Sequence, residues 1–364
     1  MRASAIALVL ISHYGVFVPA WHGYTPRYSI AVLGTLGVDL FFVLSGFLIG
    51  RLLIDVVQRA PSFANLRIFL VRRWMRTLPL YIVWLFVSLI VTPPSDGFAS
   101  HFFRYLVFMQ NLAWPMPNSN WFAVSWSLAV EEWFYLLFGT GAILFGIAMR
   151  STKAILIPLA IFIVLPPLLR WQVPDTADWD TGAAKIALLR LDSIAYGVGL
   201  AWLRSACPRL FLHPRVCGAI GICLVVVGWA SLATGTAIVS AHVRRTFLFN
   251  ALDVGFVLCI VGAAAWTRPD GLLTNIVRKI SDIAYGLYLM DLTVMLAGIG
   301  YIAYGLWTVT VGTAVVPIVL SLLSWHFFES RILELRPRQR FDGAAVNAAN
   351  GDKPEPDRKS VLGT

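Results

Sequence analysis

An arginine and a histidine lie on one face of the first apolar segment. Arg2 and His13 are eleven residues apart, which in an α-helix is about 1100° of rotation, close to three turns, and a rise of about 16 Å. Arg2 would lie at a membrane surface and His13 deep inside the bilayer. An imidazole titrates near neutral pH, so it can take up a hydroxyl proton and return it. We interpret His13 as a general base; the alternative is a histidine that only joins helices by hydrogen bonding.

Carboxylates occur at two more places from which lipid should exclude them, since a charge in the bilayer core costs about 2.5–3.5 kcal/mol. Asp39, in LGVDLFFVLSGFLIG (36–50), is predicted at a depth similar to that of His13. An aspartate within hydrogen-bonding distance would fix the tautomer of the imidazole. A helix cap near the outer surface is an equal alternative for Asp39.

The segment NWFAVSWSLAVEEWFYLLFG (120–139) carries the second group. Ser127, Glu131 and Tyr135 recur every four residues and therefore share a helical face. Glu132 adds a second carboxylate next to the first. At least one of the two is expected to face a polar cavity, and burial among apolar residues favours the protonated form of a carboxyl group. Arg190, Asp192 and Asp291 are further intramembrane charges, and we treat them as candidate site residues.

Clustered arginines follow the second apolar segment, in VRRWMRTLPLYIVW (71–84). Arg73 and Arg76 are three residues apart, hence neighbours on a helix, and Arg72 lies beside them. Guanidinium groups bind phosphate through paired hydrogen bonds, which favours a phosphorylated ligand. Simple anchoring of a cytoplasmic loop, or binding of anionic lipid headgroups, explains the same residues.

Composition identifies the elements that must position these residues. Of 364 residues, 58% are hydrophobic and 13% charged, whereas soluble domains carry about 25% charged residues. This predicts an all-α, polytopic membrane bundle of about ten helices. The predicted spans are roughly 2–20, 31–50, 78–92, 126–149, 154–171, 185–203, 216–234, 246–266, 280–298 and 306–328. Segment 101–114 is too short to span and is predicted to be interfacial or re-entrant.

Charge predicts the orientation. With the N-terminus in the cytoplasm, 22 of the 29 Lys and Arg residues fall on the cytoplasmic side, including those of the connection 51–76. Both termini are then cytoplasmic. The net charge of +10 is explained by these connections, so we predict no nucleic acid partner. Residues 1–336 form the predicted membrane domain, and 337–364 a disordered cytoplasmic tail rich in Pro, Gly, Asn and charge. The four cysteines show no zinc spacing, so no metal is expected.

The blocks together resemble the acyltransferase 3 family of membrane acyltransferases. The matching blocks are RASAIALVLISH (2–13), GVDLFFVLSGFLI (37–49), FLVRRWMRTLPLY (69–81) and SWSLAVEEWFYLL (125–137), and weaker ones are LLRLDSIAYGVGLAW (188–202), ISDIAYGLYLMD (280–291) and WHFFESRIL (325–333). The resemblance implies about ten helices in a bacterial inner membrane. It implies transfer of an acyl group, often acetyl, from cytoplasmic acyl-CoA to a hydroxyl of a surface glycan, lipid-linked sugar or glycoside.

Residue by residue, the family's R-x10-H pair falls on Arg2 and His13 and its RxxR motif on Arg73 and Arg76, while its acidic residues fall on Asp39, Glu131 and Glu132. Three departures stand out. Asp291 occupies a position where the family often has His. The family usually has residues before the first Arg, so the true start is expected upstream. The family's frequent hydrolase-like C-terminal extension has no counterpart in the short tail.

The resulting hypothesis is an acyl-CoA-dependent O-acyltransferase. Arg2, Arg72, Arg73 and Arg76 would bind the donor, and no tightly bound cofactor is expected. His13 would serve as general base or as a covalent acyl carrier, two routes that remain open, with Asp39 or Glu131 orienting the imidazole. A secondary transporter would also have buried charges, but would not explain the arginine cluster beside an aligned Arg–His pair. A structural or sensing membrane protein is the other alternative.

Overall fold

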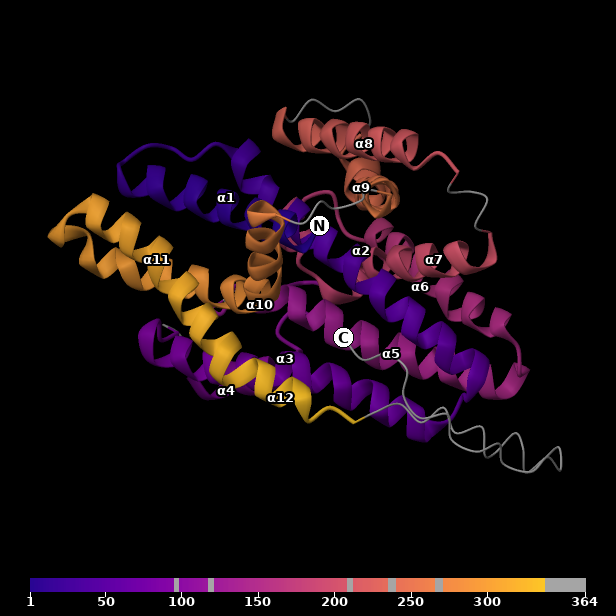
Figure 1. Ribbon diagram of the computed structural model, residues 1–364. Coiled ribbons are helices and arrows are strands. Elements are labelled where there is room, and N and C mark those ends of the chain that lie inside the picture. Colours follow the sequence, from indigo (N-terminus) through magenta and orange to yellow (C-terminus); the bar gives the residue numbers. More distant parts are fainter. Residues whose placement is uncertain (95–97, 117–120, 208–211, 235–239, 266–270, 338–364) are drawn as a thin grey trace.

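The computed structural model describes residues 1–94, 98–116, 121–207, 212–234, 240–265 and 271–337. Within these ranges every regular element is a helix (Figure 1). The α-helices are α1 (Arg2–Trp21), α2 (Tyr28–Arg59), α3 (Phe63–Val91), α4 (Phe98–Leu106), α5 (Ser125–Met149), α6 (Leu156–Trp171), α7 (Leu191–Ala206), α8 (Pro214–Thr234), α9 (Ala241–Ala264), α10 (Leu272–Gly298), α11 (Leu306–Ser324) and α12 (Ser330–Glu334). The predicted all-α class is therefore confirmed.

Nine helical segments in the described part of the chain are long and apolar enough to cross a membrane. A helix satisfies its backbone hydrogen bonds internally, as hydrocarbon requires. These nine correspond to nine of the ten predicted spans. The protein is thus a multi-pass membrane protein built as a helical bundle.

The remaining predicted span, 185–203, differs from the expectation. Its helix, α7, has only 16 residues and begins at Leu191. The chain before it is broken into a π-helical turn (Asp180–Ala184) and a 3-10 turn (Ala187–Leu189). The backbone N–H groups of Ala187 and Leu188 donate to the carbonyls of Asn111 and Leu112, at 2.8 and 3.1 Å. Non-helical backbone at membrane depth is tolerated where protein partners satisfy it in this way.

The arginine-rich connection also differs. Segment 51–76 was predicted as a loop, but α2 extends to Arg59 and α3 starts at Phe63, so only three residues separate the helices. The side chain of Ser62 accepts a hydrogen bond from the backbone N–H of Asn65 and caps α3. With 32 and 29 residues, both helices exceed the roughly 20 residues that cross the hydrocarbon. The clustered arginines are therefore carried on a helix.

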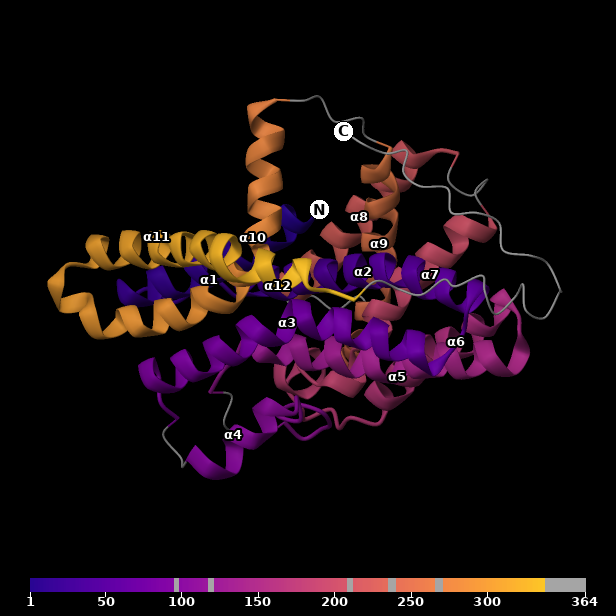
Figure 2. The ribbon, with the colours of Figure 1, turned by 60° about the horizontal axis from the view of Figure 1, so that its bottom comes forward.

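Helix α2 is the centre of the bundle. It packs against α1 and α7 most extensively, and also against α5, α8 and α9. In Figure 1, α8 and α9 lie on one side of α2 and α3–α5 on the other. Helix α10 packs against both α1 and α11. In Figure 2, α1 and α11 lie at the end of the molecule away from α6 and α7. The central position of α2 brings α1, α5, α7 and α10 around a common interior.

Two glycines permit the closest helix contact. A Cβ on Gly46 of α2 would lie 1.9 Å from the carbonyl oxygen of Ile194, and one on Gly197 of α7 would lie 2.1 Å from that of Val43. No side chain fits at such distances, and small residues at membrane helix crossings allow this approach. Gly46 lies in a sequence block that carries the family resemblance, and its packing gives a physical reason for a small residue there.

Two further predictions fall at the edges of the bundle. Segment 101–114 forms the end of the nine-residue α4 followed by turns, in agreement with a piece too short to span. The predicted tail lies, from residue 338 onward, outside the described residues. The largest hydrophobic cluster of the described part includes residues of α1, α2, α3, α5, α7 and α10.

Candidate active site

His13 on α1 is hydrogen-bonded to Asp291 on α10. The distance from Nδ1 to the carboxylate Oδ2 is 2.6 Å, and the side chains are 19% and 0% exposed. A carboxylate only accepts hydrogen bonds, so Nδ1 carries the proton and Nε2 of the neutral ring keeps its lone pair. This arrangement fixes one tautomer and prepares Nε2 to act as a base or nucleophile.

His13 lines a cavity that we call the histidine pocket. Its walls come from α1, the start of α2, the residues before and at the start of α5, the turns before α7, and α10. The side chains that give it its character are Ser12, His13, Tyr28, Trp126, Trp179, Asp180, Lys185 and Tyr288. Lys185 forms an ion pair with Asp180. Aromatic faces combined with charged and hydroxyl groups suit a polar organic molecule with hydroxyl groups.

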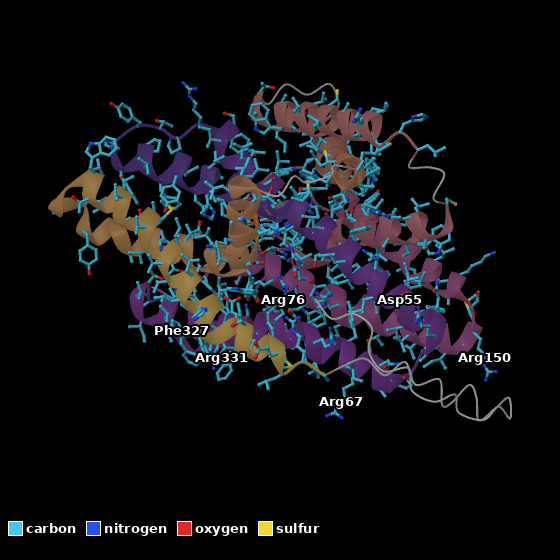
Figure 3. All side chains as sticks on the ribbon, in the orientation of Figure 1. Asp55, Arg67, Arg76, Arg150, Phe327 and Arg331 are labelled. Carbon is cyan, nitrogen blue, oxygen red and sulfur yellow. The ribbon has the colours of Figure 1, made fainter. Side chains whose placement is uncertain are left out.

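A second cavity, the arginine pocket, lies on the other side of α2 residue Val38. It is lined by Arg2, Arg73 and Arg76, together with Ser127, Glu131 and Tyr135 from α5. The predicted helical face of α5 is therefore turned into this pocket. In Figure 3, Arg76 lies towards the middle of the molecule, whereas the exposed Arg67 and Arg150 lie at its periphery. The pocket thus gathers three guanidinium groups inside the bundle.

The two adjacent glutamates of α5 point in different directions. The hydroxyl of Tyr135 donates to Glu131 and accepts from Ser45 at 2.7 Å, at the wall of the arginine pocket. Glu132 instead accepts from the hydroxyl of Thr77 at 2.7 Å and is buried between α5 and α3. Neighbouring residues differ by 100° around a helix, so only one of two adjacent side chains faces the pocket.

One known protein family matches most of the chain. The family described as "Acyltransferase domain", Acyl_transf_3, matches residues 1–326. The chain belongs to the acyltransferase 3 family.

Similar proteins include two whose names state an activity. The chain is 28% identical to the peptidoglycan O-acetyltransferase OatA of Listeria monocytogenes, over 43% of this chain and 25% of that protein. It is 24% identical to the putative peptidoglycan O-acetyltransferase YrhL of Bacillus subtilis, over 82% of this chain and 50% of that protein. Nodulation protein 10 of Rhizobium leguminosarum is 25% identical over 82% of each chain. This chain therefore spans half or less of the first two. No solved structure matches.

In this member of the family, the partner of the imidazole is a residue that the sequence analysis treated as a departure. Asp39 and Glu131 were expected to orient His13, but they hydrogen-bond Arg190 and Tyr135 instead. Asp291 of α10 supplies the carboxylate instead. Its position three residues after Tyr288 puts both side chains on the same face of α10, which is the sequence signal for it.

Asp39 belongs to a buried polar network behind the pockets. It accepts from Nη2 of Arg190, which also donates to the hydroxyl of Ser193 at 2.9 Å. Ser193 in turn donates to Asp253 at 2.8 Å. Asp39, Arg190 and Asp253 are fully buried, and none lines either pocket. Since Asp39 lies in the middle of α2, the helix-cap alternative does not hold either.

A second buried pair stands next to this network. Arg170 of α6 donates to both carboxylate oxygens of Asp192, at 3.1 and 2.7 Å, and both side chains are fully buried. Asn250 of α9 donates to the same carboxylate at 2.9 Å. Paired and hydrogen-bonded charges of this kind tolerate burial. The structure thus places the candidates Arg190 and Asp192 at the junction of α2, α6, α7 and α9, away from the pockets.

The arginine cluster includes one residue, Arg336, that the sequence analysis missed. Arg72 does not line the arginine pocket; its Nη1 donates to the backbone carbonyl of Pro337 at 2.7 Å. This contact brings Arg336 to the same region, where its Nε and Nη2 are buried without a hydrogen-bond partner. Burial, and after it the guanidinium groups of Arg76 and Arg73, lower the pKa of Arg336 to about 10. Like charges gathered in this way favour a bound polyanion.

Among the residues that the structure describes, no three His, Cys, Asp or Glu side chains come together as a metal site. The four cysteines are free thiols and line neither of the two pockets. The groups available for chemistry are therefore the His13–Asp291 pair, the arginines, and the hydroxyl and carboxyl groups between them.

Proposed function

We propose that this acyltransferase moves a short acyl group, acetyl in the first place, from acyl-CoA in the arginine pocket to a hydroxyl group in the histidine pocket. The observation that carries the proposal is the His13–Asp291 hydrogen bond at the wall of a cavity that adjoins a second, arginine-lined cavity. The arginine pocket has the positive charge to bind phosphates, and the histidine pocket contains a base.

The donor end follows from charge. Acyl-CoA carries several phosphates, and Arg2, Arg73 and Arg76 present guanidinium groups that bind phosphate through paired hydrogen bonds. Arg336 and Arg72 extend the same positive surface. The excess of Lys and Arg on this side favours a cytoplasmic opening of the arginine pocket, with both termini in the cytoplasm. The bacterial inner membrane is the location that we infer for it.

The acceptor end follows from the walls of the histidine pocket. Trp126, Trp179 and Tyr28 offer aromatic faces, and Lys185 and Asp180 offer polar contacts. Sugar rings have apolar faces and hydroxyl edges that fit such a surface. The relatives named peptidoglycan O-acetyltransferase support a glycan, a lipid-linked sugar or a related glycoside as the acceptor.

The reaction is a simple acyl transfer. Nε2 of His13 takes the proton of the acceptor hydroxyl, and the hydroxyl oxygen attacks the thioester carbon. The C–S bond breaks, the C–O bond forms, and the proton passes from His13 to the leaving thiolate. Asp291 holds the tautomer and stabilises the imidazolium that forms. The same ring can instead carry the acyl group on Nε2 for one step, with Asp291 in the same role.

The test uses the whole chain in lipid nanodiscs. Radiolabelled acetyl-CoA is the donor, and isolated cell envelope of the deletion strain is the acceptor, with product counted as alkali-labile ester. Mass spectrometry of glycans and lipids from deletion and complemented strains then identifies the acceptor. Ester formation that needs both components supports the proposal. Acetyl-CoA that neither binds nor reacts with the well-folded protein contradicts it, and favours a transporter.

A further inference from the structure

Two side chains separate the arginine pocket from the histidine pocket. Among the residues that the structure describes, only Val38 of α2 and Tyr288 of α10 line both cavities. They are 5% and 8% exposed. The two cavities therefore adjoin at this pair, which we call the Val38–Tyr288 constriction.

Hydrogen bonds hold Tyr288 across this boundary. Its hydroxyl donates to the backbone carbonyl of Val124 at 2.9 Å and accepts from the hydroxyl of Ser127 at 2.7 Å. Val124 lines the histidine pocket and Ser127 the arginine pocket. Phe41 packs edge-on against the ring, with centroids 6.5 Å apart. Groups that line the two different pockets thus hold the phenol of Tyr288 in place.

We propose that the Val38–Tyr288 constriction is the passage that the acyl carbon must reach for transfer, and that its width selects short acyl chains. The inference rests on the proposed function. When the thioester carbon lies between the two side chains, its sulfur is on the arginine side and the attacking oxygen on the histidine side. The C–S bond then breaks on one side as the C–O bond forms on the other, and His13 returns the hydroxyl proton to the sulfur.

The chemistry of the constriction explains why it would discriminate by length. An acetyl group adds only a methyl beyond the carbonyl. Each further methylene has to fit beside Val38 and a phenol that is hydrogen-bonded at its hydroxyl, and adding volume at a packed position is unfavourable. One methylene typically changes selection in such a site by about 10- to 200-fold. Acetyl-CoA, and propionyl-CoA to a lesser degree, are the donors that this passage admits.

The experiment measures rates with acetyl-, propionyl- and butyryl-CoA in the nanodisc assay described above. Tyr288→Ala and Val38→Ala widen the passage and should raise the ratio of butyryl to acetyl transfer by about tenfold or more. Val38→Leu narrows it and should lower the propionyl to acetyl ratio. Tyr288→Phe keeps the ring and should leave the ratios within about twofold. Acetyl-CoA binding, measured separately, distinguishes a change in chain-length selection from a loss of donor binding.

The matched control is Tyr105→Ala, which removes a tyrosine that is 2% exposed and lines neither pocket. This variant shows how a loss of stability alone changes the ratios of butyryl to acetyl and of propionyl to acetyl transfer. Should Tyr288→Ala fail to fold, the two Val38 variants still decide between the outcomes. Unchanged ratios in folded, active Val38→Ala and Val38→Leu proteins would overturn the passage but leave acyl transfer established. Absence of transfer from every donor in the unmodified protein would instead refute the proposed function.

Discussion

The imidazole of His13 in α1 donates a 2.6 Å hydrogen bond to the carboxylate of Asp291 in α10, although the two residues are 278 positions apart in the chain. Helices α1 and α10 pack directly against one another, so the pair depends on the folded bundle. The hydrogen bond joins His13, which the sequence analysis interpreted as a general base, to Asp291, which it treated as a departure from the family motif.

The first prediction concerns His13 itself. His13→Ala and His13→Gln should reduce acyl transfer by about 10²–10⁴-fold or more, since neither side chain can take up the hydroxyl proton. Donor binding should persist, because the arginine pocket is intact. The measurement is ester formation in nanodiscs beside acetyl-CoA binding. Substantial transfer by a well-folded His13→Ala protein would move the chemistry to other residues, with Glu131 the next to test.

Asp291→Asn tests the hydrogen bond. The amide can donate to Nδ1, which would place the ring proton on Nε2 and remove the lone pair that the reaction needs. We expect a loss of activity of about 10²–10⁴-fold with normal expression and donor binding. Asp291→Glu should retain part of the activity because it keeps the charge. Equal activity of the Asn variant and the unmodified protein would reduce Asp291 to a packing residue.

Asp39→Asn should behave differently, although the sequence suggested a similar role. Asp39 neutralises the fully buried Arg190, and removing one partner of a buried ion pair costs about 3–5 kcal/mol. The expected result is less folded protein and a lower melting temperature, with near-normal activity per folded molecule. The double variant Asp39→Leu/Arg190→Met should recover folding, which a catalytic carboxylate would not explain.

The arginines that hold the donor form the fourth prediction. Arg73→Ala and Arg76→Ala should each weaken acetyl-CoA binding by about tenfold or more, and Lys should restore it only partly, since it lacks the planar fork. Arg336→Ala should weaken binding in the same way. Arg67→Ala, on the exposed face of the same helix, is the control. Binding unchanged by all three substitutions would make the cluster a membrane anchor.

The fifth prediction concerns topology. Reporter fusions after residues 95, 175 and 240 should read as outside, and those after 60, 210 and 272 as cytoplasmic, because most Lys and Arg residues lie on the cytoplasmic side. A fusion after residue 60 that reads as outside would reverse the orientation. The arginine pocket would then face away from the cytoplasmic supply of acyl-CoA.

The sequence by itself determined the class, the helices and the helical faces. Apolar segments long enough to cross a bilayer must be helical there, because hydrocarbon offers no other partner for backbone groups. Periodicity also put Ser127, Glu131 and Tyr135 together, since residues four apart share a face whatever the helix packs against. The same argument aligned Arg2 with His13. These are properties of one segment, which a sequence contains in full.

Only the tertiary structure decided which charges meet. Asp39 and His13 were predicted at a similar depth, but depth leaves the rotation and neighbours of a helix open, and α2 turns Asp39 towards Arg190 of α7. Asp291 reaches His13 because α10 packs on α1. Arg336 joins the arginines because Arg72 binds the carbonyl of Pro337. In an interior of low polarity each buried charge needs a partner, and the packing of helices distant in the sequence determines which partner it finds.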